Sequence, residues 1–210
     1  MVLGAGGHAR VLIDVLRSAR SARAVAVLDA AARGRGGEVF GVPILGGDAL
    51  LPELRRRGVR YFVLGLGSAG DNGPRRRLYA RAVAAGLSPF SVIHPRSLVS
   101  PRAVLGAGCQ VLPGAVINAG ARLGDNVIVN SGAIVEHDCR IGHHAHIATG
   151  ARLGGGVTVG DLAFIGLGAC VRQGLSIGRA AVLGAGAVAV KNIAPGVVAV
   201  GSPARPLKGR

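Results

Sequence analysis

Aliphatic residues recur at every sixth position of the chain from Ile93 to Leu183, without a miss. The residue two places before each of them is usually Ala or Cys, and Gly often follows. An inward aliphatic residue, a small inner residue and a turn residue describe one short strand with its corner. The period is therefore an internal repeat, which decides the fold of this half of the chain. The repeated positions are Ile93, Val99, Leu105, Val111, Ile117, Leu123, Val129, Val135, Ile141, Ile147, Leu153, Val159, Ile165, Val171, Ile177 and Leu183.

Three such units close a triangular coil of 18 residues. Successive coils stack at the spacing of neighbouring strands, roughly 4.8 Å. Residues 93 to 190 thus predict a parallel β-helix, or solenoid, of a little over five coils. The period does not fix its hand, and parallel crossovers in general are right-handed.

The first ninety residues lack the repeat and alternate between strand and helix patterns. This alternation predicts a small parallel sheet in a Rossmann-like α/β domain over residues 1–90, followed by the β-helix over residues 91–210. Asp48 is expected to cap one of the helices. The expected elements are a strand at Val2–Leu3, a helix with Val11, Leu12, Val15 and Leu16 on one face, strands at Val25–Leu28 and Val59–Leu64, and a helix from Arg75 to Ala85.

A glycine-rich turn follows the first strand. Gly4-x-Gly6-x-x-Ala9 has the form of a dinucleotide-binding turn, in which glycines let backbone N–H groups approach a phosphate at a helix N-terminus. Asp29 follows about twenty residues later, at the end of the next strand, where an acidic side chain can bind a ribose or a base. A tight strand-to-helix turn without a ligand is the alternative.

The solenoid carries a polar cluster that its fold does not require. Its members are Asn130, Glu136, His137, Asp138, His143, His144 and His146. His137 lies near a corner, and Gly155, one coil later, is expected to leave open space above the imidazole for a substrate. A histidine held by Asp138 or Glu136 can act as a general base at neutral pH, which suits acyl transfer from a thioester. For His143 and His144 we favour plain surface solvation.

The close spacing of the histidines also suggests a metal site. One class of trimeric β-helix binds zinc through three histidines as a carbonic anhydrase, with the third roughly two coils before a pair. Because no histidine stands two coils before His137 or His146, we expect no metal.

Composition narrows the function classes. Lys and Arg number 25 against 10 Asp and Glu, a net charge of +15, yet the chain has six aromatic residues and no nucleic-acid motif. We therefore expect the positive field to serve a smaller anion, such as a nucleotide sugar or coenzyme A. No membrane span and no signal peptide are expected, which favours a cytoplasmic protein. Cys109, Cys139 and Cys170 are interpreted as small buried residues.

Over nearly its whole length, the chain resembles the bacterial hexapeptide-repeat sugar O- and N-acetyltransferases, typified by sialic acid O-acetyltransferase and UDP-4-amino-sugar N-acetyltransferase. The matching segments are Gly4-Ala5-Gly6-Gly7-His8-Ala9, Leu28-Asp29, Ile93-His94-Pro95, Glu136-His137-Asp138-Cys139 and Gly201-Ser202-Pro203-Ala204-Arg205. The resemblance implies a left-handed β-helix, acetyl-CoA as co-substrate and a homotrimer with its cleft between subunits.

The resemblance also implies roles for individual residues. His137 would be the general base and Asp138 its acidic partner, with Asn130 nearby in the acceptor site. His146 would contact the acetyl group or thioester of acetyl-CoA. The pantetheine path would be lined by Gly155, Leu167 and Ala185, and the nucleotide sugar would contact Gly6, Gly7, His8 and Asp29.

Some features depart from the family. Ala30 stands where a second acid often follows Asp29, the first strand is short at Met1, and the Arg33–Gly37 loop has no match. We expect acetylation of an amino or hydroxyl group of a sugar, most simply a nucleotide-linked 4-amino sugar. The alternatives are a sialic acid O-acetyltransferase, an amino-acid acyltransferase and a non-catalytic trimer.

Overall fold

The computed structural model describes residues 1–31 and 37–207, so that positions 33–36 of the loop without a family match lie outside the described residues. The chain divides into two compact units. The first comprises residues 1–67 and 74–92, and the second comprises residues 68–73 and 93–210. The short segment Ser68–Gly73 therefore belongs to the second unit although it lies within the sequence of the first.

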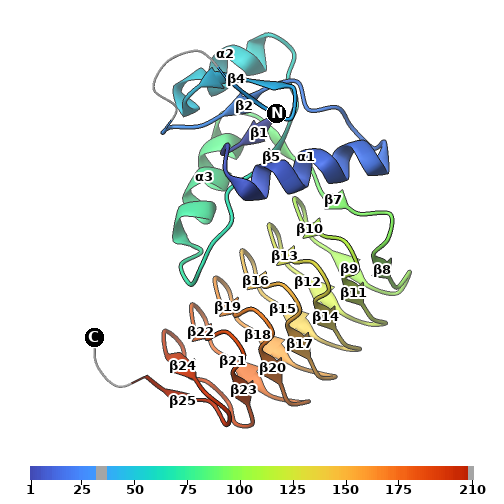
Figure 1. Ribbon diagram of the computed structural model, residues 1–210, viewed down its shortest axis with the longest axis vertical. Helices are drawn as coiled ribbons and strands as arrows, with labels where there is room; N and C mark the ends of the chain where they lie inside the picture. The colour runs from blue at the N-terminus through green and yellow to red at the C-terminus, as the bar shows by residue number, and fades with distance from the viewer. Residues whose placement is uncertain (32–36, 208–210) are drawn as a thin grey trace. The chain divides into compact units, whose positions relative to one another are not determined.

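The first unit is a mainly parallel sheet with strand order β3-β4-β2-β1-β5-β6 (Figure 1). Among the described strands of this unit, only the β3–β4 pair is antiparallel. The central strand β1 pairs with β2 on one side and β5 on the other, and this order gives the predicted α/β domain. The strands are β1 Val2–Leu3, β2 Val27–Leu28, β3 Glu38–Val39, β4 Val42–Gly46, β5 Tyr61–Leu64 and β6 Ser88–Pro89, and the helices are α1 Gly7–Ala19, the 3-10 helix η1 Asp48–Leu50, α2 Leu51–Arg56 and α3 Gly73–Ala84.

Alternate strand residues form one core of this unit. Leu3, Leu28 and Leu64 pack with Leu51 and Leu54 of α2 in a single cluster. The next strand position is also buried, as expected for a parallel sheet covered on both faces.

Two local predictions for this unit are wrong. Val11 of α1 is 38% exposed and Ile13 takes the buried position instead, because the buried face includes a neighbour at i+1 as well as i+3 and i+4. Asp48 gives η1 no side-chain cap; its carboxylate accepts a hydrogen bond from Arg81 at 2.8 Å.

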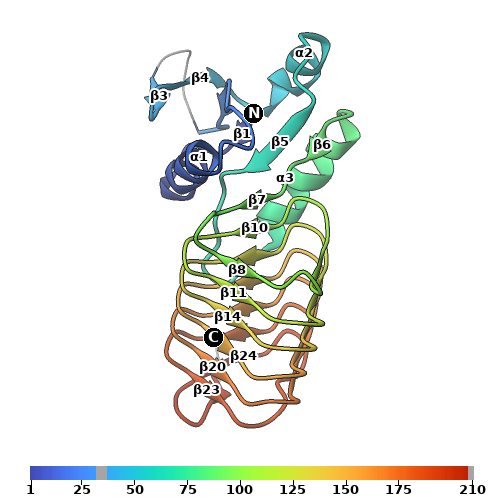
Figure 2. The same cartoon turned by 90° about the vertical axis from the view of Figure 1, so that its right-hand side faces the viewer.

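The second unit is the predicted left-handed parallel β-helix, whose coils stack one on another (Figure 2). Most strands pair in parallel with the strand 18 residues later, as Val116 pairs with Ile134, whereas at the C-terminal end β22 pairs with β24 at a spacing of 16 residues and β25 pairs with β24 antiparallel. Three flat faces result, which we number in chain order. Face 1 consists of β7 Val92–Ile93, β10 Gln110–Val111, β13 Ile128–Val129, β16 His146–Ile147, β19 Phe164–Ile165, β22 Val182–Leu183, β24 Val198–Val200 and β25 Arg205–Pro206.

The other two faces are built in the same way. Face 2 consists of β8 Leu98–Val99, β11 Val116–Ile117, β14 Ile134–Val135, β17 Arg152–Leu153, β20 Cys170–Val171 and β23 Val188–Ala189. Face 3 consists of β9 Val104–Leu105, β12 Arg122–Leu123, β15 Arg140–Ile141, β18 Thr158–Val159 and β21 Ser176–Ile177. We name each corner by the two faces it joins.

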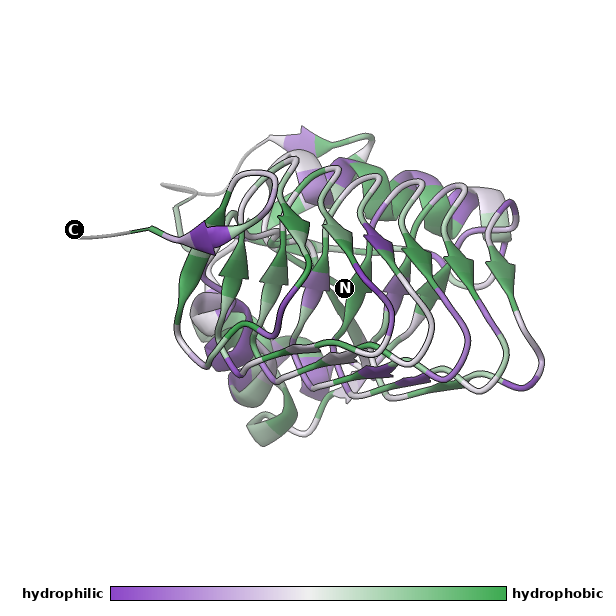
Figure 3. Cartoon of the chain, turned by 90° about the horizontal axis from the view of Figure 1, so that it is seen from below, coloured by the Kyte–Doolittle hydropathy of each residue, from purple (hydrophilic) through white to green (hydrophobic). Residues whose placement is uncertain are grey.

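The repeated aliphatic residues point inward as predicted, except at the start of the solenoid, where Ile93 is 42% exposed. From Val111 to Leu183 every one of them is buried, in a single core with the small residues two places earlier. The strands are mainly coloured as hydrophobic, and hydrophilic segments occur in some strands and in the connecting turns (Figure 3). Cys109 and Cys139 belong to the core, but Cys170 is the outward residue of its strand and is half-buried, so its predicted interior place is wrong.

Candidate functional site

His137 and Asp138 form a hydrogen-bonded pair at corner 2–3, between β14 and β15. The Nδ1 atom of His137 lies 2.9 Å from Oδ2 of Asp138. Asp138 adopts a left-handed φ of 60°, a conformation that Asp tolerates better than most residues. The hydrogen bond to Asp138 raises the pKa of His137 above its ordinary 6.5. With the proton on Nδ1, the pair leaves Nε2 as the basic atom.

Gly155 lies directly against this basic atom. A Cβ added to Gly155 would stand 2.5 Å from Nε2 and 2.6 Å from Cε1 of His137. The space that we expected Gly155 to leave open for substrate is therefore filled by the imidazole itself. The glycine is needed because the ring of His137 extends over the next coil.

Glu136 braces the backbone of this corner. Its Oε2 atom accepts hydrogen bonds from the Asn118 amide at 2.9 Å and from the backbone N–H of His137 at 3.2 Å. Two acids were considered as partners for the imidazole. Asp138 is hydrogen-bonded to the ring, whereas Glu136 is hydrogen-bonded to the backbone N–H of His137. Nothing in the sequence pattern separated these two tasks.

The surface at corner 2–3 is hollowed beside the pair. A cavity of about 480 Å³ is lined by His137, Asp138, Gly155, Gly156, Gln173 and Gly174. Among the described residues, no acceptor is found for the backbone N–H of Gly155, whereas the N–H of Gly156 is bonded to the carbonyl of His137. The corner thus holds a base, its acidic partner and an available backbone donor.

His146 lies elsewhere, on face 1, and is 3% exposed. Its Nδ1 atom is 2.9 Å from the Ser68 hydroxyl and its Nε2 atom is 3.1 Å from the Asn130 amide nitrogen. Asn130 stands at corner 1–2, so within one chain it is beside His146 and not beside His137. The expectation that Asn130 accompanies the base is wrong for a single copy, because the two residues occupy different corners.

Leu167 and Ala185 are also at corner 1–2, one coil apart, and both are exposed. They line up along the solenoid axis, whereas Gly155 lies across face 2 at corner 2–3. A single chain does not bring the three predicted pantetheine contacts together.

His143 and His144 lie at the third corner, 3–1. The Nδ1 atom of His143 accepts a hydrogen bond from the backbone N–H of Asp125 at 2.9 Å, and the backbone N–H of His143 donates to Oδ1 of Asp161 at 2.7 Å. The imidazole of His144 is 3.0 Å from Asn126, one coil before it. Both histidines thus take part in a ladder of corner contacts.

No group of three or more His, Cys, Asp or Glu residues that could hold a metal ion is found among residues 1–31 and 37–207. His143 and His144 share corner 3–1, whereas His137 lies at corner 2–3 and His146 on face 1. Within the same ranges, no helix is long and apolar enough to cross a membrane.

A second candidate site lies in the first unit, where the parallel strands end. A cavity of about 260 Å³ is lined by Gly4, Leu28, Asp29, Ala30, Asp48, Leu66, Pro74, Arg77, Leu78 and Arg81. Ligands of open α/β sheets bind at the carboxyl ends of the strands, which is where this cavity lies. Its lining includes two arginines and two aspartates, and Arg81 is paired with Asp48 at 2.8 Å.

The glycine turn beside this cavity is tightly built. Gly4 has a φ of 104°, and a Cβ there would meet the backbone of Gly65 at 3.1 Å. Gly6 and Gly7 are different, because a Cβ at either would meet nothing within 4 Å. Gly6 gives α1 no side-chain cap, so the positive end of this helix faces the turn, with His8 in its first turn.

Asp29 already holds this turn together. Its Oδ2 atom accepts a hydrogen bond from the N–H of Ala5 at 2.7 Å, and its Oδ1 atom accepts one from Ala31 at 2.8 Å. The residue predicted to contact a nucleotide therefore has a structural task of its own.

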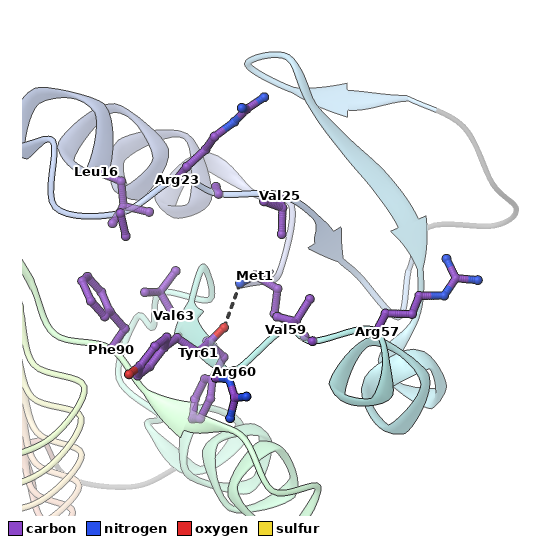
Figure 4. A pocket seen from close by; sticks show the side chains of 14 residues that line it. Met1, Leu16, Arg23, Val25, Arg57, Val59, Arg60, Tyr61, Val63 and Phe90 are labelled. Atoms are coloured by element: carbon purple, nitrogen blue, oxygen red, sulfur yellow. Dashed lines mark hydrogen bonds between the residues drawn. The ribbon is translucent and has the colours of Figure 1, made fainter.

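A larger cavity, of about 360 Å³, lies at the opposite ends of the same strands (Figure 4). It is lined mainly by apolar side chains such as Leu16, Val25 and Val63, and the terminal amine of Met1 donates a hydrogen bond to the carbonyl of Tyr61 at 2.8 Å. Burial lowers the pKa of that amine to about 6. This cavity has no counterpart of the glycine turn and is the weaker candidate for a phosphate ligand.

Two polar residues of the second unit are not predicted by the sequence pattern. Ser68 and Asn72 lie in the segment Ser68–Gly73, and Asn72 is 1% exposed. A short stretch of Ser, Asp, Asn and Gly is typical of any loop, so no signal in the sequence distinguished it.

Each of the two units matches a known protein-family model. Residues 1–82 match the model of the PglD N-terminal domain, and residues 120–155 match the bacterial transferase hexapeptide model. The search of curated proteins gives no match.

Several solved structures match over nearly the whole chain. PerB from Caulobacter crescentus, in complex with CoA and GDP-perosamine, has 41% identity and a TM-score of 0.91, covering 98% of this chain and 95% of its own. The acetyltransferase domain of PglB from Neisseria gonorrhoeae FA1090, in complex with acetyl coenzyme A, has 37% identity and a TM-score of 0.88, covering 98% and 97%. WeeI from Acinetobacter baumannii AYE, at 20% identity and a TM-score of 0.70 over 98% of both chains, shares the fold.

Proposed function

Because the chain belongs to the hexapeptide-repeat sugar acetyltransferases, we propose that it transfers the acetyl group of acetyl-CoA to the 4-amino group of a nucleotide-linked sugar. The observation that carries this proposal is the His137–Asp138 pair over Gly155, in an open hollow at corner 2–3. PerB binds CoA and GDP-perosamine, and two matched structures of perosamine N-acetyltransferase carry a histidine substitution.

The reaction needs a base, a place for negative charge and good positioning. The amine nitrogen attacks the thioester carbonyl while Nε2 of His137 takes a proton from the amine. Negative charge then develops on the carbonyl oxygen, for which the N–H of Gly155 is the candidate donor. When the intermediate collapses, the C–S bond breaks, the amide forms, and the proton held by His137 passes to the thiolate of CoA.

Asp138 gives the imidazole its direction. By accepting the proton on Nδ1, it fixes the tautomer in which Nε2 is free to act, and it stabilises the imidazolium that forms. No cysteine is needed as a nucleophile, and burial raises the pKa of Cys109 to about 11, which keeps that thiol protonated.

We propose that the cavity at the carboxyl ends of β1, β2 and β5 binds the nucleotide. The open N-terminus of α1 at Gly6, Gly7 and His8 suits a diphosphate, and Arg77 on the cavity edge adds positive charge. Asp29 shapes the glycine turn and has further lone pairs for a ribose or base. The N-terminal domain over residues 1–90 would thus select the acceptor.

We further propose that the active unit is a homotrimer formed through face 2. The outward residues of face 3 are mostly polar or charged, whereas those of face 2 are mostly aliphatic, and a solenoid gains by burying such a face. The outward residues are Val104, Arg122, Arg140, Thr158 and Ser176 on face 3, and Leu98, Val116, Ile134, Arg152, Cys170 and Val188 on face 2.

A threefold ring uses two different surfaces of each copy. Contact through face 2 would bring corner 2–3 of one copy beside corner 1–2 of the next. His137 and Gly155 would then share a cleft with Leu167 and Ala185 of a neighbouring copy. This arrangement would explain why the predicted acetyl-CoA contacts lie apart in a single chain. The enzyme would operate in the cytoplasm.

An acceptor screen tests the proposed function. Purified protein is mixed with acetyl-CoA and with UDP-, GDP- or dTDP-linked 4-amino sugars, and the released thiol and the product mass are measured. The matching 4-hydroxy sugars, CMP-sialic acid and free sialic acid serve as comparisons. We expect thiol release and acetamide formation with one nucleotide-linked amino sugar. Ester formation on a hydroxyl, or release with no acceptor of this class, would contradict the proposal.

A further inference from the structure

A directed chain of hydrogen bonds ties the segment Ser68–Gly73, which we call the strap, to the β-helix. It runs from Asn130 through His146 and Ser68 to Asn72. The joining distances are 3.1 Å from Asn130 to His146, 2.9 Å from His146 to Ser68 and 2.5 Å from Ser68 to Asn72. All four residues lie in the second unit.

Backbone groups fix the amide orientation at both ends. The carbonyl oxygen of Asn130 accepts a hydrogen bond from the N–H of Ser131 at 2.8 Å, so its NH₂ group faces His146. The NH₂ group of Asn72 donates to the carbonyls of Leu162 and Ala163 at 3.1 and 3.0 Å, so its oxygen faces Ser68. Neither amide can flip without losing backbone hydrogen bonds.

These ends determine the protons between them. The Ser68 hydroxyl donates to the oxygen of Asn72 and must accept from Nδ1–H of His146. Nε2 of His146 then accepts from the NH₂ group of Asn130. The ring is therefore neutral with its proton on Nδ1, because a second proton on Nε2 would face the amide protons of Asn130.

Burial makes the chain costly to break. Asn72 and His146 are 1% and 3% exposed. The ring of Phe164 packs edge-on against the imidazole of His146, with 5.1 Å between the ring centroids. A buried polar group that loses its partner costs about 1–3 kcal/mol. Pro74 follows the strap directly and Leu66 precedes it by two residues, and both line the proposed nucleotide cavity.

We propose that Ser68 and Asn72 are positioning residues that hold His146 as a neutral Nδ1–H imidazole and anchor the strap on face 1. This inference rests on the proposed function only for its effect on the acceptor. His146 does not act as an acid or base, since both ring nitrogens are engaged in holding the strap and Asn130. Any effect of the strap on the nucleotide cavity would pass along the chain, to Leu66 on one side and to Pro74 on the other.

The tautomer is measured directly in the unmodified protein. Protein labelled with ¹⁵N-histidine gives long-range ¹H–¹⁵N correlations whose pattern distinguishes Nδ1–H, Nε2–H and imidazolium rings. His146 is assigned by the signals lost in His146→Gln. We expect an Nδ1–H ring that stays unchanged from pH 8 to pH 6, whereas an Nε2–H or imidazolium ring for His146 in this range would overturn the inference.

Kinetics test the positioning role. Ser68→Ala removes the link between His146 and Asn72, and we expect KM for the nucleotide sugar to rise about tenfold, with kcat changed less. Ser68→Thr keeps the hydroxyl and should restore both the tautomer and KM, and Ser176→Ala, on exposed face 3, is the matched control. An unchanged tautomer and KM in Ser68→Ala would refute the role. The NMR measurement needs no substrate, so it decides the inference even if the acceptor screen fails.

Discussion

Adding one methyl group at Gly155 should disable the base without unfolding the protein. The new Cβ of Gly155→Ala would stand 2.5 Å from Nε2 of His137, where ordinary contact begins near 3.4 Å. The backbone of Gly155 does not occupy the left-handed region, so alanine adds no φ strain there. The ring must therefore move by about 1 Å, and misplacement of that size costs on the order of 10² in rate.

Stability should change little, because the imidazole can swing away. The side chain of His137 is 63% exposed, so it is not trapped as a core residue would be. Overpacking of a closed core costs about 1–3 kcal/mol, and we expect the loss here to fall below that range. The variant should thus keep its melting temperature within a few degrees while kcat falls about a hundredfold.

Thiol release under saturating substrates and a thermal melt provide the two readouts. The double variant His137→Ala/Gly155→Ala isolates the clash, because it removes the ring that the methyl group meets. If the methyl group acts through the imidazole, Gly155→Ala should not lower the residual rate of His137→Ala any further. Wild-type kcat in Gly155→Ala, or equal losses in both backgrounds, would refute this reasoning.

Three further predictions follow from the geometry. Asp138→Asn, which keeps the left-handed backbone, should move the acidic limb of the pH–rate profile to lower pH, because a neutral amide replaces the carboxylate that raises the pKa of His137; an unmoved limb would count against the pair. Ile134→Arg on face 2 should break the trimer in analytical ultracentrifugation and Thr158→Arg on face 3 should not, whereas equal behaviour would exclude face 2 as the interface. Asp29→Ala should destabilise the first unit by about 1–3 kcal/mol in chemical denaturation by leaving the N–H of Ala5 without its carboxylate, and an unchanged midpoint would show that this contact is dispensable.

The solenoid could be predicted almost completely from the sequence. A strict period of six leaves the inward set of residues no alternative, and every repeated aliphatic residue from Val111 to Leu183 is buried where the pattern placed it. The α/β domain was harder, because two-residue strands such as β1 and β2 give little periodic signal. The hairpin of β3 and β4 went unpredicted for the same reason.

The candidate site was found in part. His137 and Asp138 are neighbours in sequence and meet in space as expected, but the role of Gly155 was misjudged, since a period shows which residues stack and not which side chain fills the gap. Within one chain Asn130 lies beside His146 and not beside His137, because the assignment of a residue to a corner depends on its register within the coil. The strap was missed because its bonds join residues 78 positions apart, from Ser68 to His146.

The general base is the central claim, and the rate of acetyl transfer in His137→Ala tests it most directly. His143→Ala is the matched control, because it removes an exposed histidine of the same solenoid from another corner. With acetyl-CoA and the accepted nucleotide-linked amino sugar, kcat of His137→Ala should fall by about 10²–10⁴ while His143→Ala stays within about threefold of the wild type. Turnover by His137→Ala at the wild-type rate would contradict the account.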